Sequence, residues 1–439
     1  MRADQSDVDR TGRATQPERL LAAILSDRGM VKYASFTFVS RIFARFAQLL
    51  LLILVARLLS VDEFAAYSYI VVVALTFSVL ADTGVPLVAS REIASGREDV
   101  RATFWSSVPI VLGGAGIAAA ALVVFGLFDS GPGTSGEPLL LAAAYAATNT
   151  LFNFCATTMR GLGLFKAEAL LQGGGALCMV TVGALVVTLD AGVEALLAVL
   201  VAKEGASLMI AGGMITHAVG HPARAHPRLW RRLLRSGIHL SLSSTALILV
   251  TRVPLILLAN SGSKHAVAWF SAPLRMADAI LVLGMTAGYS LFPGLSALEP
   301  VDPMRARRLL FRAIKFGGVG SVALAAILVV FADPIVPLLF GRTFEASVSC
   351  ARVLFLGVPA YALLGLGWFA LLASGEERKV LAYGAGAVGI ALGLGLALIP
   401  PMSDVGAAWA YTGSVTALAF VTVTATIRRV AHVCRSVPQ

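Results

Sequence analysis

The chain has 439 residues, of which 57% are hydrophobic and only 14% are charged, and its net charge is +10. A soluble domain has about a quarter of its residues charged, so this composition excludes an ordinary soluble protein and predicts an all-α polytopic membrane protein. The basic excess is expected to hold a cytoplasmic face against anionic lipid, and it does not indicate nucleic-acid binding.

Residues 1–35 are hydrophilic and lack the apolar core and cleavage site of a signal peptide, so a cytoplasmic N-terminal tail is expected. Beyond the tail, about twelve stretches contain the roughly 20 apolar residues that a membrane-spanning helix needs. They cover residues 36–58, 66–87, 105–128, 138–159, 167–189, 193–216, 237–259, 267–292, 316–340, 350–373, 380–400 and 405–427. The ninth contains Asp333-Pro334, where a break in the helix is expected.

The first span, in the stretch SRIFARFAQLLLLILVARLL, carries two arginines one helical turn apart. At 1.5 Å per residue, Arg41 lies roughly 8 Å and Arg45 roughly 14 Å inside the membrane. Thr37 and Gln48 share their helical face. A charge near mid-bilayer costs at least ~2.5–3.5 kcal/mol, so both arginines are expected to face a hydrated cavity.

The connections predict the orientation of the chain. Most of the 35 lysines and arginines fall in the N-terminal tail, in alternate connections and after the last span. By the positive-inside rule, both termini are therefore expected in the cytoplasm and the protein in the cell (inner) membrane.

The long basic connection between the sixth and seventh spans divides the chain into two halves. The N-terminal lobe is predicted at 36–217, a cytoplasmic linker at 218–236, the C-terminal lobe at 237–427, and a C-terminal tail at 428–439. A weak similarity between 61–70 and 263–272 suggests a parallel repeat. Two six-helix lobes around a central cavity would work by alternating access.

Further charges fall within later spans. Arg252 has no acid near it in sequence, whereas Arg275 has Asp278 three residues on, which could neutralise it. Lys203 and Glu204 are adjacent, project about 100° apart, and suit an ion pair or ion coupling equally well. The spans hold more cations than anions, and an anionic ligand would supply the missing charge.

The sequence contains no catalytic or nucleotide-binding motif. The chain has no GxxxxGK[ST] phosphate loop, no nucleophile with its base and no dinucleotide motif. Its four cysteines and six histidines lack metal-ligand spacing. We therefore expect no enzyme activity, no cofactor and no metal.

Several stretches resemble a known family. They include ARLLSVDEFAAYSYI (56–70), ADTGVPLVASREIA (81–94), RGLGLFKAEALLQ (160–172), TRVPLILLANSGSKHAVAWFSAPLRM (251–276), FADPIVPLLFGRTFEASVSCARVLFLG (331–357) and VGAAWAYTGSV (405–415). In this order they resemble the polysaccharide biosynthesis proteins of the O-antigen flippase type, within the multidrug/oligosaccharidyl-lipid/polysaccharide exporter (MOP) superfamily. The resemblance implies two six-helix lobes around a V-shaped cavity, and transfer of polyprenyl-diphosphate-linked sugars between leaflets.

The predicted function is therefore a flippase for a polyprenyl-diphosphate-linked oligosaccharide, with membrane lipid as its surroundings. Arg41, Arg45, Arg252 and Arg275 are the candidate substrate-binding residues, since guanidinium groups bind phosphate oxygens in pairs. Lys203, Glu204 and Asp278 are candidates for ion coupling or structural pairing. A polysaccharide polymerase and glycosyltransferases are candidate partners. A cation-coupled multidrug antiporter of the same superfamily and a non-transporting scaffold of a polysaccharide assembly complex remain alternatives.

Overall fold

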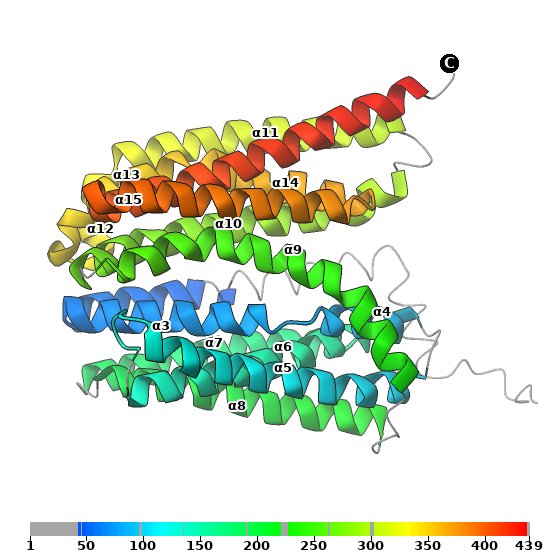
Figure 1. The fold of residues 1–439 in the computed structure, drawn as a ribbon, viewed down its shortest axis with the longest axis horizontal. Helices are drawn as coiled ribbons and strands as arrows, with labels where there is room; N and C mark the ends of the chain where they lie inside the picture. The colour runs from blue at the N-terminus through cyan, green and yellow to red at the C-terminus, as the bar shows by residue number, and fades with distance from the viewer. Residues whose placement is uncertain are drawn as a thin grey trace, which may run out of the picture.

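The computed structural model describes residues 43–44, 46–95, 99–134, 136–189, 192–220, 227–261, 264–298 and 303–436. Within these ranges the regular elements are helices (Figure 1). The first described helix is Phe46–Leu58. The others are α3 (Val61–Leu80), α4 (Val85–Ser95), α5 (Val100–Phe128), α6 (Glu137–Gly161), α7 (Phe165–Thr188), α8 (Gly192–Val219), α9 (Pro227–Ala259), α10 (Lys264–Leu298), α11 (Pro303–Val330), α12 (Ala332–Phe340), the 3-10 helix η1 (Arg342–Ser347), α13 (Val348–Leu356), α14 (Val358–Ala373) and α15 (Glu377–Ser436).

The helices lie in two groups side by side, which Figure 1 shows one above the other. We call Phe46–Leu58 together with α3–α8 the N-terminal bundle, and α9–α15 the C-terminal bundle. Ten described helices are long and apolar enough to cross a membrane, one of which is the bent α15, and Phe46–Leu58 is a shorter apolar helix. The predicted all-α polytopic class is confirmed, and these elements are compatible with about twelve crossings.

Helix α3 lies on the side of the N-terminal bundle that faces α9 and α10 of the C-terminal bundle (Figure 1). It begins at Ser60, whose hydroxyl accepts a hydrogen bond from the Glu63 backbone while the Glu63 carboxylate accepts one from the Ser60 backbone. This reciprocal cap satisfies two amides that the helix start would otherwise leave unpaired. Two thirds of the apolar window of α3 is buried in protein, against 11% for α11. Similar hydropathy therefore serves a packed core in one helix and a lipid-facing surface in the other.

Helix α9 joins the two bundles. The predicted linker at 218–236 is only partly separate, because from Pro227 onward it forms the start of α9. Figure 1 shows this bent start lying against α4, where Arg232 Nη2 binds Glu92 Oε1 at 2.6 Å. A Cβ added at Gly84, which has φ +70°, would lie 2.3 Å from the Gly237 carbonyl oxygen. Glycine at both positions thus lets the two backbones touch.

A second close backbone contact lies within the C-terminal bundle, between α10 and α14. A Cβ at Gly288 would lie 2.1 Å from the Gly365 carbonyl oxygen, and one at Gly365 would lie 2.1 Å from that of Gly284. Small residues allow such close helix packing in membranes. The two helices therefore pack without a layer of side chains between them at this crossing.

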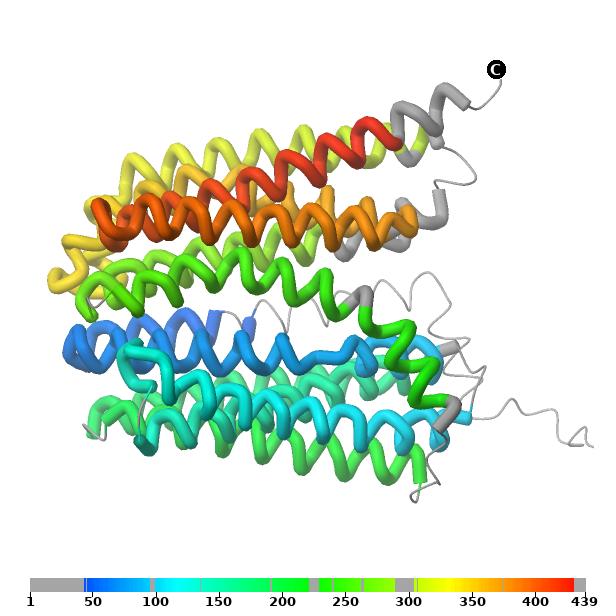
Figure 2. Tube along the Cα trace, viewed as in Figure 1, coloured from blue at the N-terminus to red at the C-terminus, as the bar shows by residue number. Residues whose placement is uncertain are grey.

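Two helices differ from their predicted courses. The expected break near Asp333 is present, since α11 ends at Val330 and α12 begins at Ala332. However, α11 begins at Pro303, whereas the ninth span is predicted to begin at residue 316. The basic residues of the predicted connection therefore lie on the helix; they are Arg305, Arg307, Arg308, Arg312 and Lys315. Helix α15 bends at Ser403, just after Pro400 and Pro401, and Figure 2 shows its two arms running back along each other.

The two ends of the molecule differ in charge and in how the bundles meet. We call the end holding α4, the start of α9 and the α14–α15 turn the basic end; it is the end predicted to face the cytoplasm. At the opposite end, Arg57 Nε donates to the Leu339 carbonyl at 2.9 Å. Asn260 Nδ2 donates to Asp129 Oδ1 at 2.9 Å. These bonds hold the bundles together at that end.

Candidate functional site

Three charged residues in the membrane-spanning parts of α9 and α10, Arg252, Arg275 and Asp278, lie beside the contact between the two bundles. Arg252 Nη1 lies 2.8 Å from Asp278 Oδ2, and their side chains are 13% and 16% exposed. The hydroxyl of Tyr411, on the second arm of α15, donates to Asp278 Oδ1 at 3.0 Å. Both oxygens of Asp278 thus have partners from other helices. The acid that Arg252 lacked in its local sequence is supplied by α10.

Arg275 therefore does not pair with Asp278, although Asp278 is only three residues away in the sequence. Arg275 is half-buried, and no ion pair joins it to any residue in the described ranges. Arg252 repels it, Asp278 attracts it, and Tyr67 of α3 and Tyr145 of α6 lie within its electrostatic reach. Since both tyrosines belong to the N-terminal bundle, Arg275 reaches across the interface between the bundles.

The interface cluster, which we define as Arg252, Arg275, Asp278 and Tyr411, carries two guanidinium groups against one carboxylate. Arg275 lies about 16 Å along α10 from its start at Lys264, well inside a hydrocarbon layer about 30 Å thick. An ionised side chain at this depth normally faces protein or water and pairs with an opposite charge. The cluster can therefore bind an anion, and a diphosphate suits its planar donors.

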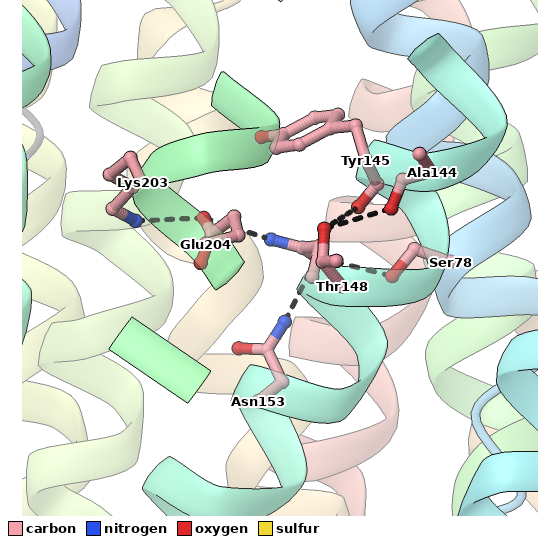
Figure 3. A network of polar contacts seen from close by, with 8 residues as sticks. Ser78, Ala144, Tyr145, Thr148, Asn153, Lys203 and Glu204 are labelled. Atoms are coloured by element: carbon pink, nitrogen blue, oxygen red, sulfur yellow. Dashed lines mark hydrogen bonds and ion pairs between the residues drawn. The ribbon is translucent and has the colours of Figure 1, made fainter. Parts of the chain in front are cut away.

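Lys203 and Glu204 form a second charged group, enclosed within the N-terminal bundle (Figure 3). Lys203 Nζ lies 2.7 Å from Glu204 Oε1, and the two side chains are 14% and 6% exposed. The ammonium also lies 5.3 Å from the centre of the Phe152 ring, close enough for a cation–π interaction. The neighbouring charges therefore neutralise each other.

Asn149 on α6 connects this ion pair to α3. Its Nδ2 donates to Glu204 Oε1 at 3.4 Å, and its Oδ1 accepts from Ser78 Oγ at 3.1 Å and from Asn153 Nδ2 at 3.0 Å. Figure 3 shows these side chains converging between α6 and α8. Glu204 Oε1 thus accepts from both Lys203 and Asn149, whereas Glu204 Oε2 is buried without a hydrogen-bond partner in the described part of the chain.

The other two predicted site residues, Arg41 and Arg45, lie outside the described residues. The structure thus brings Arg252, Asp278 and Arg275 together on facing elements and keeps Lys203 and Glu204 apart from them, within the N-terminal bundle. Their assignment to a substrate remains a prediction.

Six polar residues beside these charges escaped the sequence analysis: Tyr67, Ser78, Tyr145, Asn149, Asn153 and Tyr411. A usable signal existed for the tyrosines, since each stands in an apolar stretch. A buried tyrosine usually needs a hydrogen-bond partner for its hydroxyl, which makes it a candidate neighbour of a buried charge. Which charge it meets depends on helix packing, which the sequence does not specify.

Comparisons with known proteins agree with this architecture. A family model described as "Polysaccharide biosynthesis protein" matches residues 30–299. No curated protein matches the chain. Among solved structures, an inward-facing multidrug resistance MATE family transporter of the MOP superfamily matches with a TM-score of 0.73 at 16% identity, covering 90% of this chain and 96% of that one.

Two more solved structures have the same fold. A Vibrio cholerae MATE transporter matches with a TM-score of 0.66 at 17% identity, covering 95% of this chain and 99% of that one. The lipid II flippase MurJ matches with a TM-score of 0.64 at 14% identity, covering 92% and 90%. The chain is a multi-pass membrane protein with the fold of these transporters, and it belongs to the polysaccharide biosynthesis protein family.

Proposed function

We propose that the protein is a flippase, which moves a polyprenyl-diphosphate-linked oligosaccharide from the inner to the outer leaflet for cell-surface polysaccharide synthesis. The observation that supports this most is the position of Arg275, a guanidinium without a matching carboxylate that faces the other bundle. A diphosphate would supply the missing negative charge. Its polyprenyl chain would remain in lipid while the sugar head passes between the bundles.

The substrate is bound mainly by charge in this proposal. A charge-assisted hydrogen bond is about twice as strong as a neutral one, and a guanidinium can make two in parallel to phosphate oxygens. Arg275 would contact the diphosphate directly, and Arg252 would join it once the bound anion competes with Asp278. Arg41 and Arg45 would extend the cationic path along the first span. Energy would come from an ion gradient or from consumption of the product.

The deciding experiment is deletion of the gene followed by analysis of membrane lipids. We expect a polyprenyl-diphosphate glycan to accumulate on the cytoplasmic leaflet and to disappear when the wild-type chain is restored. Restoration with Arg275→Gln should leave the accumulation in place. Restoration with Lys264→Gln, which removes an exposed cation at the start of the same helix, should clear it. Normal lipid in the deletion strain would refute the proposal.

The likeness to multidrug transporters keeps a cation-coupled drug antiporter as the second candidate, because the fold is shared with that group. Such a protein needs an ionised acid free to bind cations. The two buried glutamates described in the N-terminal bundle are instead paired, Glu204 with Lys203 at 2.7 Å and Glu168 with Arg160 at 2.8 Å. Drug sensitivity of the deletion strain, with unchanged lipids, would favour this candidate.

A further inference from the structure

A pocket of about 610 Å³ lies at the basic end, away from the interface cluster. It lies between the two arms of α15 and the turn that precedes α15. Its lining residues are Glu376, Lys379, Tyr383, Phe420, Val421, Thr424, Ala425, Arg428 and Arg429. The proposed transport cycle gives this pocket no role.

The rim of the pocket is positively charged. Lys379 Nζ lies 2.7 Å from Glu376 Oε2, and Arg429 Nη1 lies 2.7 Å from Glu376 Oε1. Arg428 is exposed, and no ion pair joins it to another residue in the described part of the chain. Three cations therefore surround one carboxylate, and Arg428 still has its donors available. An anionic group would balance this surplus.

The rest of the lining is apolar. Phe420 lies about 12 Å along the helix from Arg428 and is 70% exposed, with Val421 and Ala425 beside it. In a membrane protein, such a surface at this depth faces acyl chains. A ligand that fits the whole pocket therefore has an anionic head level with Arg428 and an apolar chain beside Phe420. A soluble anion would leave the apolar part unused.

We infer that this pocket binds an anionic diacyl phospholipid of the cytoplasmic leaflet. The phosphate lies among Lys379, Arg428 and Arg429, and one acyl chain lies against Phe420 and Val421. Basic pockets between membrane helices on the cytoplasmic side bind anionic head groups in this way. The inference depends on the membrane orientation and not on the flippase proposal, so either can fail without the other.

The test is native mass spectrometry of the full-length protein titrated with phosphatidylglycerol or with phosphatidylcholine of the same acyl chains. The wild type should prefer phosphatidylglycerol. Arg428→Gln and Lys379→Gln should each lower that preference about fivefold, the effect of roughly one surface cation. Arg91→Gln, which removes an exposed cation at the same end but in the N-terminal bundle, should leave the preference unchanged.

Several outcomes would overturn the inference. An equal loss in the Arg91→Gln variant would mean general attraction to the basic surface rather than a site. Full displacement of the lipid by millimolar inorganic phosphate would mean a site for a soluble anion. Displacement by an equimolar polyprenyl phosphate would mean a substrate site. Unchanged preference in both pocket variants, with melting temperatures like the wild type, would remove the site altogether.

Discussion

Two groups of charged residues lie at similar depth in the two bundles, yet they differ in balance. Glu204 lies about 18 Å along α8 and Arg275 about 16 Å along α10, each counted from the helix start. In the first group one lysine meets one glutamate inside a single bundle. In the interface cluster one aspartate is present for two arginines: Asp278 pairs with Arg252, and Arg275 faces the other bundle. We therefore take the unbalanced charge at the interface, and not the balanced pair within one bundle, as the candidate for function.

The largest effect is expected for Arg275→Gln. Losing a charge-assisted hydrogen bond costs about 1.5–3 kcal/mol, so substrate affinity should fall roughly ten- to a hundredfold. Arg275→Lys keeps the charge but loses the planar fork, and should recover only part of the rate. Transport of labelled glycolipid in proteoliposomes measures both. Wild-type transport by Arg275→Gln would place the binding site elsewhere.

Removing one partner of the enclosed ion pair should affect stability rather than transport. Glu204→Gln leaves Lys203 buried without a carboxylate, which should cost about 3–5 kcal/mol of folding free energy. The double variant Lys203→Met/Glu204→Gln removes both charges and should recover most of this loss. Thermal unfolding in detergent measures the difference. A drop in transport per folded molecule in the double variant would assign the pair a role in coupling.

The Arg252–Asp278 pair allows the same comparison at the interface. Asp278→Asn keeps a partner for Tyr411 but leaves two arginines unpaired, so it should lower thermal stability by several degrees. Arg252→Gln/Asp278→Asn should restore that stability while Arg275 remains. We expect the double variant to lose less transport than Arg275→Gln. Equal loss would show that Arg252 contributes as much to substrate binding as Arg275 does.

The smallest effect is expected at Glu376, outside the spans. The hydrogen bond from Lys379, followed by that from Arg429, lowers the pKa of Glu376. A lowered folded-state pKa stabilises the protein above the unfolded value of about 4.3, and this contribution is lost as the pH falls through the folded value. The group lies near solvent, so under about 1 kcal/mol is expected. Melting curves of wild type and Glu376→Gln, measured from pH 7 to pH 3, should converge at the acid end.

Hydropathy was sufficient to predict the class of the protein, because a span must satisfy its backbone internally and contact lipid. Hydropathy did not locate the break near Asp333, which the Asp333-Pro334 pair predicted. It could not choose between the two neighbours of Asp278, since Arg275 is three residues away along α10 and Arg252 is on α9. The choice depends on how the helices rotate against each other, which in turn depends on packing with α15. The contact of Tyr411 with Asp278 can be recognised only once this helix packing is known.

The glycine crossing of α10 and α14 has a mechanical consequence. With backbone against backbone at Gly284, Gly288 and Gly365, neither helix can slide or roll past the other without a steric collision. Arg275 lies two to three helical turns before Gly284 on α10, so it must move together with α14 as part of one rigid body. Any conformational change that moves a substrate across the membrane must therefore occur at another contact, the interface between α10 and α3.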